Sequence, residues 1–158
     1  MVRSIALGLA ASLLSATAVF AQTPPAAAPA QPAAAAPSPF VFPGDAGVIL
    51  NFVKADKTAD FEMVLGKVKE ALAKSDKPER KAQAASWKVF KSPEPAAGGN
   101  VLYVFLIDPA VKDADYTVST ILAEAFPQEV QAIFKQYSEA YASGQNFVNL
   151  ALVQKLGQ

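Results

Sequence analysis

The sequence predicts an α+β fold in which a four-stranded antiparallel sheet carries its helices on one face. Three observations lead to this prediction. Four short apolar runs have the length and composition of strands, two longer segments repeat apolar residues at helical spacing, and the order along the chain is β-α-β-β-α-β. Residues 44–158 are expected to form one α+β domain, which is long enough for a single hydrophobic core.

The N-terminal segment has the features of an export signal. Arg3 is followed by an uncharged stretch through Phe20, which is short for a membrane span, and a small residue precedes Gln22. We therefore expect residues 1–21 to be a signal peptide that is cleaved after Ala21, which places the mature protein in the periplasm or outside the cell. An uncleaved anchor is the alternative. After cleavage we expect no membrane span.

Residues 22–43 are predicted to form a disordered linker. The stretch QTPPAAAPAQPAAAAPSP is dominated by alanine and proline. Repeated proline removes backbone donors and clashes with a preceding helical turn, so the segment favours an extended polyproline conformation over a helix. We expect this linker to act as a spacer.

The domain is predicted to begin with a strand over residues 47–55 and a helix over residues 58–75. The strand, GVILNFVKA, is apolar and rich in β-branched residues. Thr58 is placed to cap the helix, and Pro78 either ends the helical pattern or opens a short helical turn. The helix carries one apolar stripe, made of Phe61, Val64, Leu65, Val68 and Leu72.

The second and third strands are expected to form a hairpin. Residues 84–92 alternate between two faces, residues 93–100 have the prolines and glycines of a turn, and residues 101–107 are apolar throughout. A further helix is expected over residues 117–126, with Pro127 interrupting it or starting a new one. Gly144 then serves as a helix stop, and residues 146–156 supply the fourth strand.

The second face of this sheet is predicted to be apolar as well. Two helices cover only one face, and the other face of an antiparallel sheet is usually polar. Here the first, third and fourth strands have apolar residues on both faces, which makes a patch larger than the few hundred Å² that a monomer typically exposes. A second copy of the chain, an apolar ligand or the folded-back linker could cover it, and an isologous homodimer is the favoured solution.

The β-α-β-β-α-β order is that of ferredoxin-like folds, and residues 46–156 resemble the dimeric α/β-barrel superfamily, in particular its antibiotic-biosynthesis monooxygenase-like proteins. The resemblance implies two sheets packed face to face in a dimer, with a cavity between each sheet and its helices. Some members oxidise aromatic substrates, and others degrade haem with an Asn and a Trp, which Asn51 and Trp87 resemble in kind. The haem-degrading members also use a histidine, which this chain lacks.

The amino-acid composition excludes several kinds of catalytic, metal-binding and covalent chemistry. The chain has neither histidine nor cysteine, which excludes Ser-His-Asp and Cys-His nucleophiles, Cys/His zinc sites and disulfides. Asp108, Asp113 and Asp115 lack the glycine and glutamate of a calcium loop, so we expect a solvated turn and no metal. No cofactor is expected either.

Charge argues against a nucleic-acid partner. Removing Arg3 from the 14 basic residues leaves 13 against 14 acidic residues, so the mature chain has no basic excess. A basic group near the end of the first helix complements the helix dipole, with an anionic ligand as the minor alternative. This group contains Lys74, Lys77, Arg80 and Lys81.

Two functions fit these observations. The favoured one is a non-catalytic, homodimeric binding module for a small apolar ligand or a protein partner, because such a module needs no catalytic residues. The alternative is a cofactor-independent monooxygenase or isomerase, as the resemblance implies. No catalytic residue can be assigned, and the candidate pocket, whose aromatic members could equally be core residues, comprises Asn51, Phe52, Trp87, Tyr103 and Phe105.

Overall fold

The computed structural model describes residues 40–157 of the 158-residue chain. The predicted signal peptide and most of the predicted linker lie outside these residues. The strands and helices are β1 (Ala46–Val53), α1 (Thr58–Lys74), α2 (Pro78–Ser86), β2 (Trp87–Pro95), β3 (Val101–Ile107), α3 (Val118–Ala125), α4 (Val130–Ala140) and β4 (Tyr141–Leu150), with short 3-10 helices at Ala55–Lys57 and Ala97–Gly99.

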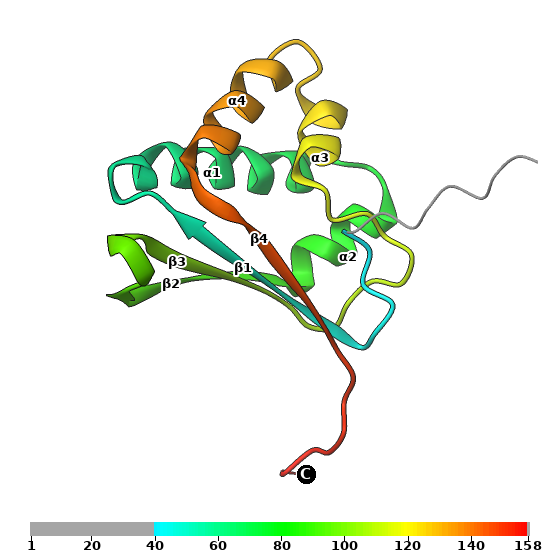
Figure 1. Cartoon of the computed structure of the whole chain (residues 1–158). Coiled ribbons are helices and arrows are strands. Elements are labelled where there is room, and N and C mark those ends of the chain that lie inside the picture. Colours follow the sequence, from blue (N-terminus) through cyan, green and yellow to red (C-terminus); the bar gives the residue numbers. More distant parts are fainter. Residues whose placement is uncertain (1–39, 158) are drawn as a thin grey trace, which may run out of the picture. The chain divides into compact units, whose positions relative to one another are not determined.

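The four strands form one antiparallel sheet in the order β2-β3-β1-β4. The helices lie on one side of this sheet, and no helix or strand of the described residues lies on the other side (Figure 1). The prediction of an α+β fold with a four-stranded antiparallel sheet and its helices on one face is therefore confirmed.

Helix α1 forms where the apolar stripe predicts it. The stripe residues Phe61, Val64 and Val68 are buried against the sheet and the other helices. The predicted cap is absent, because Thr58 is itself the first helical residue and its hydroxyl donates to the Ala55 carbonyl at 3.4 Å. The chain enters α1 directly from the 3-10 helix Ala55–Lys57.

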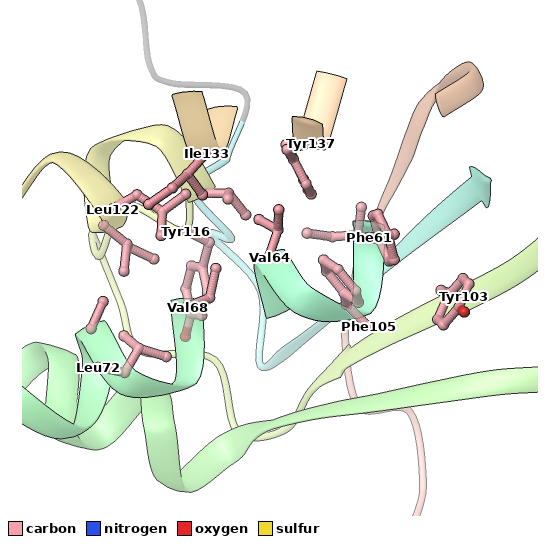
Figure 2. Packing of buried hydrophobic residues seen from close by; sticks show 14 of the residues in the cluster. Phe61, Val64, Val68, Leu72, Tyr103, Phe105, Tyr116, Leu122, Ile133 and Tyr137 are labelled. Atoms are coloured by element: carbon pink, nitrogen blue, oxygen red, sulfur yellow. The ribbon is translucent and has the colours of Figure 1, made fainter. Parts of the chain in front are cut away.

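The core lies between the sheet and α1, α3 and α4 (Figure 2). Phe61 is at its centre, with its ring centroid 4.8 Å from that of Tyr103 on β3 and 5.6 Å from that of Tyr137 on α4. The core also includes Phe42, two residues before the expected start of the domain at residue 44. Phe42 covers Gly47, where any Cβ atom would collide with its ring.

Two segments differ from their predicted elements. Residues 84–86 belong to α2 instead of β2, and β4 begins at Tyr141, five residues before the predicted start of that strand at residue 146. Gly144 lies within β4 and does not end α4. Pairing with β1 explains the early start of β4, because Tyr141 lies opposite Val53 in the sheet and its ring packs on Phe61.

The strand registers decide which side chains face the helices. Asn51 on β1 lies between Tyr103 on β3 and Gln145 on β4, and all three point to the helix side. The next residues along β1 point the opposite way, as the pleat of a strand requires. The opposite face of the sheet therefore carries Leu50, Phe52 and their cross-strand neighbours.

Candidate functional site

Asn51 is buried at the centre of a polar cluster between the sheet and α4. Its Nδ2 donates to the carbonyls of Ile49 at 3.1 Å and Tyr103 at 3.2 Å. Its Oδ1 accepts from the Tyr141 hydroxyl at 2.9 Å and from Gln145 Nε2 at 2.7 Å. Both donors and both acceptor positions of the amide are thus used inside the fold, which leaves none for a substrate.

Two tyrosine hydroxyls complete this cluster and stay protonated. Gln145 Nε2 lies 3.0 Å from the Tyr137 hydroxyl and 2.9 Å from the Tyr141 hydroxyl. Burial raises the pKa of Tyr137 to about 12, and burial together with the neighbouring Tyr137 raises the pKa of Tyr141 further. Neither hydroxyl can act as a general base near neutral pH.

Tyr103 carries a second polar contact at the edge of the core. Its hydroxyl donates to Glu62 on α1, and Lys91 on β2 contacts the same carboxylate oxygen at 2.8 Å. The hydrogen bonds from Lys91 and then Tyr103 lower the pKa of Glu62. A carboxylate held ionised in this way is a poor general acid, and the contact joins α1 to the edge strand β2.

Trp87 lies at the start of β2 and packs edge-on against two other aromatic rings. Its ring centroid is 5.5 Å from those of Phe105 and Tyr116. Its indole Nε1 is the one buried side-chain polar atom among residues 40–157 without a hydrogen-bond partner. Trp87 lines an apolar groove of about 310 Å³ between α1, the end of α2 and β2.

The five residues of the predicted pocket do not line one cavity. Asn51 and Tyr103 meet across β1 and β3, and Trp87 contacts Phe105, so these four share the helix side of the sheet. Phe52 points to the opposite face. The groove beside Trp87 has none of the other four in its lining, so the structure divides the predicted set between the core, the groove and the far face of the sheet.

The far face, which we call the open face, is largely apolar across all four strands. In the regularly paired part of the sheet its polar residues are Lys88 and Asn146, the latter opposite Leu50. Phe90, Val148 and Leu150 are 51%, 42% and 38% exposed, and the central residues are partly buried by their neighbours. The open face consists of Val48, Leu50, Phe52, Phe90, Leu102, Val104, Leu106, Val148 and Leu150.

A buried arginine forms a polar network that the sequence did not predict. Arg80 on α2 has a side chain only 3% exposed and binds Glu124 on α3 through two parallel hydrogen bonds of 3.1 and 2.9 Å. It also donates to Gln83 and to the Asp115 carbonyl. The sequence predicts that Arg80 belongs to a basic group that complements the helix dipole, whereas the structure pairs its side chain with Glu124. The pair is separated by 44 positions, a distance at which sequence spacing carries no signal.

The aspartates of the 108–115 segment form a turn. Asp115 accepts hydrogen bonds from the backbone N–H and the hydroxyl of Thr117, just before α3. Within the part of the chain that the structure describes, no three acidic side chains gather as they would around a metal ion. The same residues contain no helix long and apolar enough to span a membrane.

We compared the chain with protein-family models, curated proteins and solved structures. The chain matches no family model, no curated protein and no solved structure.

Proposed function

We propose that the protein is an exported, non-catalytic binding module that pairs with a second copy of itself through the open face. The observation that carries this proposal is the apolar character of that face. Nine apolar side chains, with one lysine and one asparagine among them, leave a surface that water solvates poorly, and no described element covers it. In a dimer with twofold symmetry, this face would pack against the same face of the second copy.

The C-terminal segment supports the same pairing. After β4 the chain continues without regular structure, and its apolar residues Val153 and Leu156 are 96% and 93% exposed (Figure 1). The segment remains attached to the sheet through a 3.0 Å hydrogen bond from the Leu152 N–H to Asp45. These exposed side chains add apolar area that a partner could bury.

A ferredoxin-like fold of the dimeric α/β-barrel type is part of this proposal. The order β2-β3-β1-β4 places β1 between two antiparallel neighbours, so that β1 and β2 are parallel across β3, and β3 and β4 are parallel across β1. Each parallel pair is joined through helices on the same side of the sheet. Two such split βαβ units support a ferredoxin-like assignment.

The polar groups of the helix side favour a binding role over an enzymatic one. Asn51 has no free donor or acceptor, and the nearby tyrosine hydroxyls stay neutral. A monooxygenase or isomerase that used Asn51 to orient a substrate would have to break this network first. The saturated amide is therefore read as structural.

Size-exclusion chromatography with light scattering tests the pairing. We expect the purified protein to have the mass of a dimer and Leu50→Lys, at the centre of the open face, to have the mass of a monomer, because a lysine there places a charge in the buried contact. Ala123→Lys, on the exposed side of α3, is the matched control and is expected to remain dimeric.

Three results would contradict the pairing. A monomer at all concentrations that binds no hydrophobic dye would show that the face is already covered within the chain. A monomer that retains a co-purifying apolar compound in native mass spectrometry would assign the face to a ligand. A dimer that persists in Leu50→Lys would place the contact elsewhere.

A further inference from the structure

The groove beside Trp87 has the form of a small-molecule site. It lies on the helix side of the sheet, where α1 and α2 diverge above the edge strand β2. Its volume of about 310 Å³ falls at the small end of the range of about 300–1,000 Å³ that is typical of ligand pockets. Its walls are almost wholly apolar and include Leu65, Val68, Leu72, Ala84, Trp87 and Val89.

Gly66 keeps this groove open. It occupies the middle of α1, where glycine costs about 1 kcal/mol relative to alanine, so helix stability alone does not favour it. A Cβ atom at this position would meet no atom within 4 Å, and the residue lines the groove. A larger side chain would therefore fill the groove without disturbing the backbone.

Lys69 is the one charged residue in the lining, and its charge is not neutralised within the described chain. The residues three and four positions away on α1 are Leu65, Gly66, Leu72 and Ala73, none of which is acidic. No ion pair involves Lys69 among residues 40–157, whereas its helix neighbours Lys67 and Lys74 pair with Glu129 and Glu70. An uncompensated cation at an apolar groove is complementary to an anion with an apolar body.

Trp87 lines the groove, but its polar atom lies out of reach of solvent. Its Nε1 is buried and has no acceptor among the described residues. Leaving a buried donor unsatisfied costs about 1–3 kcal/mol, and such a group in a native structure calls for an explanation. Because solvent cannot reach this atom, a ligand in the open groove does not reach it either, so the unpaired N–H is a cost of the fold.

We propose that this groove binds a small amphipathic carboxylate, with its hydrocarbon portion between Leu72 and Trp87 and its carboxylate at Lys69. The site goes beyond the proposed pairing and does not depend on it, because the groove and the open face lie on opposite sides of the sheet. A dimer formed through the open face leaves the groove accessible to solvent.

Trp87 is the single tryptophan of the chain, so its fluorescence reports directly on the groove. The test is a titration with decanoate below its micellar concentration, with decanol as the uncharged ligand of equal chain length. We expect saturable binding of decanoate that shifts the Trp87 emission. Decanol should bind several-fold more weakly, because it cannot pair with Lys69.

Two pairs of variants locate the site. Lys69→Met should weaken decanoate binding about threefold to fivefold, the range of an exposed ion pair, and leave decanol unchanged. Lys81→Met, at an exposed position outside the groove, is the control. Gly66→Leu should abolish the binding of both ligands, whereas Gly66→Ala should retain it.

The outcomes separate this proposal from the pairing. Equal affinity for decanoate and decanol, or no response to Lys69→Met, would overturn the assignment of a carboxylate. Binding that survives Gly66→Leu would show that the ligand lies elsewhere, and loss of binding in Leu50→Lys would place it on the open face. The variants at Lys69 and Gly66 should leave the mass of the dimer unchanged in light scattering, so each proposal can fail alone.

Discussion

Asn51 is held in the core by hydrogen bonds more than by packing. An amide buried among aromatic rings is costly unless all its groups are paired, and here they are. The amide joins β1 to β3 and β4 and is in turn held by side chains from β4. A single side chain thereby connects β1 to both of its neighbouring strands.

We predict that Asn51→Ala destabilises the fold by about 2–3 kcal/mol. The change leaves the Tyr141 hydroxyl and Gln145 Nε2 without their shared acceptor, and unsatisfied buried groups cost about 1–3 kcal/mol each. Urea unfolding followed by Trp87 fluorescence measures the loss. Asn149→Ala, at an exposed position of β4, should change stability by less than about 0.5 kcal/mol. Equal effects of the two changes would refute the structural role of Asn51.

The ion pair between Arg80 and Glu124 gives the protein an acid-sensitive contact. The hydrogen bonds from Arg80 are the main cause that lowers the pKa of Glu124 from 4.5 to about 2. A carboxylate whose pKa falls on folding stabilises the native state above its ordinary pKa, and this contribution is lost as pH falls from about 4.5 towards 2.

We therefore predict that Glu124→Gln lowers the melting temperature at neutral pH and has a much smaller effect near pH 2. Thermal unfolding followed by circular dichroism at both pH values is the measurement. Asp76→Asn, at an exposed position between α1 and α2, is the control and should be nearly neutral throughout. A constant difference between wild type and Glu124→Gln across this pH range would argue against the ion pair as its cause.

At the scale of the elements, two glycines differ in whether their surroundings have room for a side chain. Gly66 is in the middle of α1 with open space around its Cα, and Gly47 is in β1 beneath the ring of Phe42. We predict that Gly66→Ala stabilises the protein by about 0.5–1 kcal/mol, the helix preference of alanine. Gly47→Ala should destabilise it, because Phe42 is itself buried and cannot move aside freely.

Chemical denaturation of the two variants compares these positions directly. If Gly66→Ala proved destabilising, the open space beside α1 would be in doubt. If Gly47→Ala proved neutral, the packing of Phe42 on β1 would be in doubt.

The accuracy of the sequence predictions follows from how local the signals are. Helix α1 was found from its helical stripe, and strands β1 and β3 from short apolar runs, because each of these signals is contained within a few residues. The start of β4 was missed because the apolar stripe of α4 continues in sequence to Tyr141, while the pairing of Tyr141 opposite Val53 is set by a strand far away along the chain. Long-range pairing overrode the local pattern.

The candidate site shows the same division. The alternation of β1 separates Asn51 from Phe52, and the sequence places them on opposite faces. Which of them would share a face of the sheet with Trp87 could not be predicted from strand patterns, because that depends on where α2 ends and β2 begins. Ion pairs such as Arg80 with Glu124 bring together distant positions whose chemistry is ordinary, so they leave no motif.

At the scale of the whole molecule, the predicted export would place the protein outside the cytoplasm, where it would bind the proposed ligand and the second copy of the chain. We predict that the mature protein begins at Gln22, because the residues before it have the pattern of a cleaved signal peptide. Intact mass spectrometry of protein recovered from an exporting cell measures the cleavage. A mass that retains Arg3 would support an anchored form instead.

The position of β1 between β3 and β4 also sets the order in which the chain can fold. The first strand to be synthesised finds one of its two neighbours only when the last strand arrives, since Ala46 lies opposite Leu150. Topologies dominated by such distant contacts fold slowly. A chain that leaves the cytoplasm as we propose would thus remain unfolded until nearly all of it has been made, which is the state that a narrow translocation channel accepts.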